Sequence, residues 1–224
     1  MEERYNKYPF VFPFLFVLIL WAIKLFEIQN NISFSHYAVF PRDINKLFGI
    51  FVTPFVHADF EHLTNNSLPL LVLGTVVFYF YREVAVKIFV LVWLLSGFWV
   101  WMAARPAFHI GASGVVYGLS SFIFFSGLFR KYYKMIAISL LVVFLYGSMV
   151  WGIFPMEKGV SWEGHLFGAV SGLILAYHYR KIGPQRKVYD WELEEEDDWF
   201  DNKSDEDDVT AHEFTYVYKP KSDD

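Results

Sequence analysis

Residues 109–127 read HIGASGVVYGLSSFIFFSG. The first serine of this stretch, Ser113, lies between small residues at the start of an apolar run. A serine in such a run can pack against a neighbouring helix, or it can act as a nucleophile just inside a lipid bilayer. The choice between these roles depends on which other polar groups lie at the same depth.

The composition indicates a membrane protein. Of the 224 residues, 55% are hydrophobic and 21% are aromatic, well above the aromatic content of a soluble domain. The chain has no cysteine, which excludes disulfides, thiol nucleophiles and cysteine metal sites. The net charge of −5 averages a basic body and an acidic tail, because fifteen of the 24 acidic residues lie from Asp190 to Asp224. The basic residues form short clusters between apolar runs, which is typical of membrane proteins and not of nucleic-acid binders.

Six apolar runs approach the ~20 residues that a helix needs to cross ~30 Å of hydrocarbon. The runs are Pro9–Phe26, Leu63–Tyr81, Val86–Met102, Ser113–Phe129, Met135–Val150 and Gly164–Tyr179. We therefore expect an all-α polytopic membrane protein, a bundle of six transmembrane helices. Eleven basic residues at one set of helix ends, against five at the other, put both termini in the cytoplasm. The second, fourth and sixth helices then run inward from the outer face.

The chain divides into three regions. Residues 1–8 form a short cytoplasmic N-terminus, residues 9–182 form the six-helix membrane domain, and residues 183–224 form an acidic tail. The composition of the tail predicts cytoplasmic disorder, and its aromatic residues could dock on an unknown partner. The first loop, about residues 27–62, contains apolar patches. We expect this loop to carry short helices and to lie on or partly in the outer leaflet.

Four polar side chains lie near the outer ends of the even-numbered helices. They are His62 and Asn66 on the second helix, Ser113 on the fourth and His165 on the sixth. Because these three helices run in the same direction, the four side chains share one level below the membrane surface. Each alone has a structural explanation, as a packing contact or a helix cap. Together they supply what acyl transfer requires: a hydroxyl, an imidazole that takes its proton and donors for an oxyanion.

Glycines favour a close approach of the fourth and sixth helices. They are Gly114 and Gly118 on the fourth helix and Gly164, Gly168 and Gly172 on the sixth. Small residues four apart let two helix backbones approach, which would bring Ser113 within reach of His165. Tyr117 lies one turn after Ser113 on the same face, so its ring could stack on the imidazole.

These motifs resemble those of the rhomboid intramembrane serine proteases. HADFEHLTNN at 57–66, GASG at 111–114 with Tyr117, and GHLFGAVSG at 164–172 occur in the family's order. The resemblance covers roughly residues 45–180. It implies a Ser–His dyad with Ser113 as nucleophile and His165 as base, and it implies neither a metal nor a cofactor.

The resemblance also implies roles for neighbouring residues. His62 and Asn66 match the positions that line the oxyanion hole, together with the backbone N–H of Ser113. Gly111 matches the glycine that precedes the nucleophile, and His57 matches a loop histidine with a structural role.

One position departs from the family pattern. Many members carry a Trp-Arg pair in the first loop, where Phe48 and Gly49 stand in this chain. Anchoring of the loop by that arginine is therefore not expected. The implied partners are the lipid bilayer and transmembrane segments of substrate proteins, with no nucleic acid. We expect a multi-pass protein of a bacterial inner membrane, because the sequence has no cysteine and no organelle signal.

Other classes fit the sequence less well. A rhomboid-like pseudoprotease would bind membrane helices without cutting them, but such proteins usually lose the serine or the histidine. A transporter or channel would place polar groups along a path rather than at one level. HADFEH lacks the H-E-x-x-H ligand pair of zinc proteases, and no span contains an aspartate. A soluble hydrolase elbow would place glycine where Val115 stands.

Overall fold

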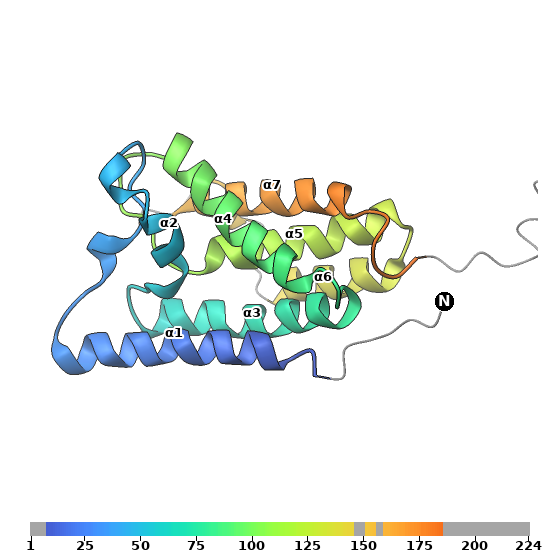
Figure 1. The fold of residues 1–224 in the computed structure, drawn as a ribbon, viewed down its shortest axis with the longest axis horizontal. Helices are drawn as coiled ribbons and strands as arrows, with labels where there is room; N and C mark the ends of the chain where they lie inside the picture. The colour runs from blue at the N-terminus through green and yellow to red at the C-terminus, as the bar shows by residue number, and fades with distance from the viewer. Residues whose placement is uncertain (1–7, 146–150, 156–158, 186–224) are drawn as a thin grey trace, which may run out of the picture. The chain divides into compact units, whose positions relative to one another are not determined.

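The computed structural model describes residues 8–145, 151–155 and 159–185, and within them the chain is all-helical (Figure 1). Contacts divide the chain into Met1–Arg186 and Lys187–Asp224, and every described residue belongs to the first unit. The elements are α1 (Val11–Asn30), η1 (Ser35–Tyr37), η2 (Ile44–Lys46), α2 (Gly49–Val52), η3 (Thr53–Phe55), α3 (Phe60–Phe80), α4 (Ala85–Ala103), α5 (Ser113–Phe129), α6 (Tyr133–Leu145), η4 (Trp151–Ile153) and α7 (Trp162–His178). Outside the described residues lie most of the predicted N-terminal segment, the end of the fifth apolar run and the acidic tail from residue 186.

Within the described residues, most of each apolar run falls in one helix, namely α1, α3, α4, α5, α6 or α7. Three of them, α1, α3 and α4, are long and apolar enough to cross a membrane. The helices α5 and α7 have 17 residues each, and α6 has 13. Large apolar side chains of α1, such as Phe14, Leu15 and Leu18, point outward and are exposed, as expected for a helix in contact with lipid. The chain is therefore a helical membrane protein, and the crossing by all six helices stays a prediction.

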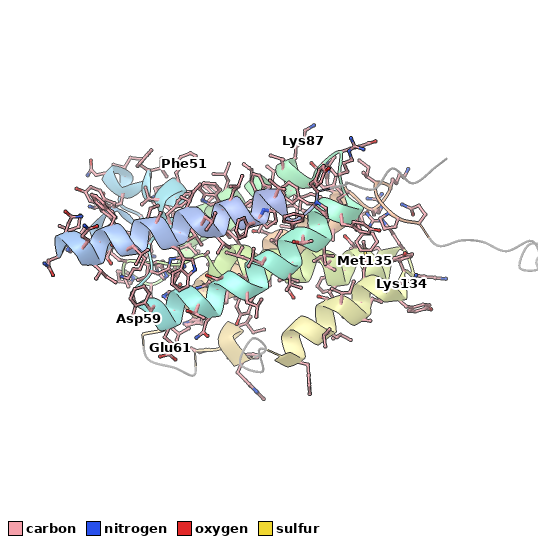
Figure 2. All side chains as sticks on the ribbon, turned by 90° about the horizontal axis from the view of Figure 1, so that it is seen from below. Phe51, Asp59, Glu61, Lys87, Lys134 and Met135 are labelled. Carbon is pink, nitrogen blue, oxygen red and sulfur yellow. The ribbon has the colours of Figure 1, made fainter. Side chains whose placement is uncertain are left out.

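Helix direction places three helix starts at one end of the described unit. Figure 1 shows α3, α5 and α7 running in the same direction, each beginning at the left. Asp59 and Glu61, at the start of α3, lie at the end opposite Lys87 and Lys134 (Figure 2). The polar residues near the three helix starts therefore share one level, as the sequence predicts.

The first loop contains short helices, as predicted: η1, η2, α2 and η3 follow α1. The last turns of α1 carry a buried ion pair, in which Lys24 Nζ lies 3.3 Å from Glu27 Oε2. Lys24 Nζ also donates hydrogen bonds to the carbonyls of His57 and Ala58, at 2.9 and 3.0 Å. The end of the loop is therefore tied to α1.

The first loop has space only for glycine at position 49, where many family members carry the arginine of the Trp-Arg pair. A Cβ at this position would overlap the backbone of Ala38 and Val39. An arginine at 49 is therefore excluded by this loop conformation. The indole N–H of Trp93 instead donates to the Ile50 carbonyl at 2.8 Å, which fixes α2 against α4.

The helices α5 and α7 pack through their glycines, as the spacing predicts. A Cβ on Gly168 would overlap the Gly114 backbone, and a Cβ on Gly172 would overlap the Gly118 carbonyl. A Cβ on Gly114 would lie 3.3 Å from the Gly164 carbonyl oxygen. The two backbones are therefore in direct contact along this seam, beginning beside Ser113 and His165.

We expect Gly168→Ala to lower the free energy of unfolding by about 1–3 kcal/mol. The added methyl group meets helix backbone, which cannot move aside without separating α5 from α7. Gly97→Ala is the comparison, because its Cβ would meet a side-chain atom, Ile50 Cγ2 at 2.8 Å, so that α2 and not a long helix backbone would have to shift. Denaturant unfolding in detergent micelles measures both variants. Equal losses in the two would contradict the role given to the seam.

Candidate functional site

A cavity of about 730 Å³ lies between the starts of α3, α5 and α7 and the short helix η4. The predicted site residues that line it are His62, Asn66, Ser113, Tyr117 and His165. Of the predicted residues, Gly111 and His57 stand outside this lining. The structure thus brings five of the seven predicted residues to one cavity.

Ser113 is the first residue of α5 and is partly exposed. The helix starts after Ala112 without a side-chain cap. The first N–H groups of a helix have no acceptor within it, and its N-terminus favours a negative charge. The backbone of Ser113 therefore offers an oxyanion donor next to the Ser113 hydroxyl.

His165 is buried near the start of α7, and its orientation is fixed by two contacts. Its ring stacks on Tyr117, with centroids 4.2 Å apart and planes 5° from parallel. Its Nδ1 lies 2.8 Å from the Gly152 carbonyl oxygen. Because a carbonyl only accepts, the hydrogen-bond network assigns the proton to Nδ1. The Nε2 atom is then left unprotonated, which is the state that a general base requires.

Ser113 and His165 lie near the same end of the glycine seam, on α5 and α7. A Cβ on Gly114, which follows Ser113, would lie 3.3 Å from the carbonyl oxygen of Gly164, which precedes His165, and both functional side chains line the same cavity. Within the described part of the chain, no hydrogen bond joins the Ser113 hydroxyl to the His165 imidazole. Hydrogen bonds of this kind often tighten only in the complex with substrate.

His62 and Asn66 face the backbone that precedes the nucleophile. A Cβ on Gly111 would lie 2.6 Å from His62 Nε2 and 3.8 Å from Asn66 Nδ2. Gly111 also has a φ of +101°, a conformation that glycine adopts without strain. Asn66 Nδ2 uses one hydrogen for the His62 carbonyl, at 2.8 Å, so its second hydrogen stays available to a ligand in the cavity.

His57 lies behind the cavity wall, where it is 1% exposed. Its Nε2 accepts a hydrogen bond from the Ala112 N–H at 3.4 Å, directly before Ser113. Burial lowers the pKa of His57 to about 3, and the nearby His62 ring and Lys24 ammonium act in the same direction. The imidazole is therefore neutral at physiological pH and supports the backbone that carries the nucleophile.

Gly152 is a site residue that the sequence did not predict. Its carbonyl orients His165, and a Cβ on it would overlap the Tyr117 hydroxyl. A backbone acceptor leaves no side-chain signal in the sequence. The short helix η4 that carries it also lies outside the apolar runs, so no pattern pointed to it.

A family model described as "Rhomboid domain" matches residues 45–182 of this chain. The chain belongs to the rhomboid family. It is 34% identical over 182 residues to "Uncharacterized protein Rv1337" of Mycobacterium tuberculosis, over 77% of this chain and 75% of the relative. It is 32% identical over 183 residues to "Uncharacterized protein ML1171" of Mycobacterium leprae, over 77% of this chain and 71% of the relative.

The family match confirms the resemblance on which the site was predicted. The matched region contains all seven predicted site residues. This rhomboid is thus a member of an intramembrane protease-like family.

We expect the stability of this rhomboid to fall in acid partly because of His57. The pKa of His57 is about 3 in the folded protein, against 6.5 for an ordinary histidine. Between pH 3 and pH 6.5 the unfolded chain binds one more proton at His57 than the folded chain does. The contribution of His57 to the free energy of unfolding is therefore complete only above pH 6.5. It decreases as the pH falls toward 3, by at most about 1.4 kcal/mol per pH unit for this residue.

Unfolding midpoints in detergent at pH 7, 6, 5 and 4 measure the effect for the wild type and His57→Gln. The variant should show a shallower loss of stability with falling pH, because it removes a group that binds a proton on unfolding. Parallel pH profiles for the two proteins would contradict this assignment.

Proposed function

We propose that this rhomboid is an intramembrane serine protease that cleaves transmembrane segments of other membrane proteins by a Ser113–His165 dyad. One observation carries the proposal. The Gly152 carbonyl holds the Nδ1 proton of His165, so the unprotonated Nε2 belongs to an imidazole that shares a cavity with the Ser113 hydroxyl.

The acylation step follows from these positions. His165 Nε2 takes the proton of Ser113 as Oγ attacks the carbonyl carbon of the scissile peptide bond. The tetrahedral intermediate collapses when the imidazolium gives its proton to the leaving amine. Water in the cavity then attacks the acyl-enzyme, with His165 again as base, and releases the new carboxyl terminus together with free Ser113.

The developing oxyanion has three candidate donors. They are the backbone N–H of Ser113, the side-chain amide of Asn66 and a ring N–H of His62. The close approach of both side chains to Gly111 supports this grouping, because it sets them beside the backbone that leads into the nucleophile. Donors preorganised in this way stabilise the transition state more than the ground state.

The cavity also offers an apolar surface to a substrate helix. Trp151 and Phe154 line it and are 61% and 48% exposed. In the described part of the chain, α6 packs on α5 but has no extensive contact with α3. We assign the gate for the substrate to the α3–α6 side, and α6 also carries the exposed Phe144.

The proposed setting is a bacterial inner membrane that all six helices cross, with both termini in the cytoplasm. The mycobacterial relatives support a bacterial origin. The separation of Lys87 and Lys134 from Asp59 and Glu61 (Figure 2) supports the orientation, because basic residues favour the cytoplasmic side. The partners are the bilayer and substrate transmembrane segments, and neither nucleic acid nor a cofactor is required.

We expect Ser113→Ala to reduce cleavage of a panel of single-span proteins in proteoliposomes to background. A fluorophosphonate probe should label the wild type and not this variant. Ser126→Ala, at the other end of the same helix, is the matched control and should retain both activities. A wild type that binds membrane segments but neither cleaves them nor reacts with the probe would instead identify a pseudoprotease.

We expect Asn66→Ala to lower kcat by about 10²–10³-fold, the usual effect of losing one oxyanion donor. Asn65→Ala provides the control, because Asn65 also lines the cavity but is not among the donors. Steady-state cleavage of one mapped substrate gives kcat and KM for each variant. An Asn66→Ala enzyme with wild-type kcat would remove this side chain from the oxyanion hole.

A further inference from the structure

A second set of contacts joins the two segments that carry Ser113 and His165, apart from the glycine seam. His109 Nδ1 lies 2.6 Å from Ser161 Oγ. His109 precedes Ser113 by four residues, and Ser161 precedes His165 by four residues. The hydrogen bond therefore joins the two chain segments at the same distance in sequence before the nucleophile and before the base. The catalytic steps proposed above do not involve it.

The hydrogen-bond network fixes the direction of this contact. His109 Nε2 lies 3.1 Å from the Arg105 carbonyl oxygen, which can only accept, so Nε2 carries the proton. Nδ1 is then an acceptor, and the Ser161 hydroxyl donates to it. The same hydroxyl oxygen accepts the Gly164 N–H at 3.4 Å as the N-cap of α7. One serine thus caps the helix of the base and binds the loop of the nucleophile.

An ion pair runs alongside this contact. The Arg105 side chain lies 3.5 Å from Glu163 Oε1, and Arg105 Nη2 donates to the Val160 carbonyl at 2.5 Å. Glu163 is 4% exposed and His109 is 3% exposed. Burial lowers the pKa of His109, which keeps the imidazole in the neutral form that the network assigns.

His109 is also held through its backbone, by residues of the first loop. Its backbone N–H donates to the Val39 carbonyl at 3.0 Å, and its backbone carbonyl oxygen lies 3.2 Å from the Thr53 hydroxyl, whose single hydrogen is shared with the Gly49 carbonyl at 2.8 Å. Two residues later, the Gly111 N–H donates to the Thr53 carbonyl at 3.0 Å. The segment before the nucleophile, residues 104–112, is therefore anchored to the first loop. The His109–Ser161 hydrogen bond connects this anchored segment to the start of α7.

We propose that the His109–Ser161 hydrogen bond is a positioning contact that sets the alignment of Ser113 with His165. This inference rests on the proposed proteolytic function. The glycine seam sets the distance between the helix backbones, whereas this contact sets the rotation and height of the base relative to the nucleophile. Small misalignments matter, because a displacement of about 1 Å can lower a rate about 10²-fold.

The test is a double-mutant cycle on the full-length protein in proteoliposomes. The variants are Ser161→Ala, His109→Leu and the double variant, with Ser161→Thr as the conservative rescue. Ser171→Ala is the matched control, because Ser171 is a buried serine of the same helix that donates only to its own backbone, at Phe167. His109→Leu keeps Ser161 as the helix cap and so separates the contact from capping.

The readouts are the rate of fluorophosphonate labelling of Ser113 per folded molecule, kcat and KM for one substrate, and the unfolding midpoint. We expect each single variant to lower the labelling rate and kcat by about 10- to 10²-fold, with KM within about twofold of the wild type for His109→Leu. The double variant should lose no more than the larger single loss, because the two residues act as a unit. Ser161→Thr should recover most of the rate, and Ser171→Ala should keep it.

Wild-type labelling rates per folded molecule in both single variants would overturn the inference and leave the proposed function standing. Losses that multiply in the double variant would do the same, because they would show two independent effects. A wild type in which Ser113 does not react with the probe would overturn the proposed function, and this inference with it.

Discussion

The backbone contact between α5 and α7 is the constraint on which the site depends. Lipid provides little hydrophobic drive for helices to associate, so close packing must come from van der Waals contact. Gly168 and Gly172 supply it, because any side chain there would overlap the α5 backbone. The seam starts at Gly114 and Gly164, next to Ser113 and His165. The contact between α5 and α7 therefore both stabilises the bundle and carries the two residues of the proposed dyad.

The N-termini of α3, α5 and α7 are capped in different ways. Asp59 caps α3 and Ser161 caps α7 through their side chains, whereas α5 has no side-chain cap. An uncapped N-terminus exposes N–H groups and a positive end of the helix dipole. The helix that carries Ser113 is thus the one whose start is left open to an anion. This asymmetry suits a site that must stabilise negative charge only transiently.

The sequence predicted the helices and most of the side chains of the candidate site, because apolar runs and polar groups within them are both local signals. It placed the end of the first run at Phe26, whereas α1 continues to Asn30. The difference has a physical reason: the first loop folds back so that Lys24 is buried beside Glu27. The Gly152 carbonyl and the His109–Ser161 contact depend on tertiary structure, so no periodicity or motif could reveal them.

The first loop illustrates how the chain compensates for a missing family feature. Phe48 and Gly49 replace the Trp-Arg pair, and Gly49 packs so closely on the backbone of Ala38 and Val39 that no side chain fits. The loop is fixed from α1 instead, through Lys24 and the His57 carbonyl. His57 in turn accepts the Ala112 N–H. A buried cation in the first helix is therefore connected, through one histidine, to the backbone that precedes Ser113.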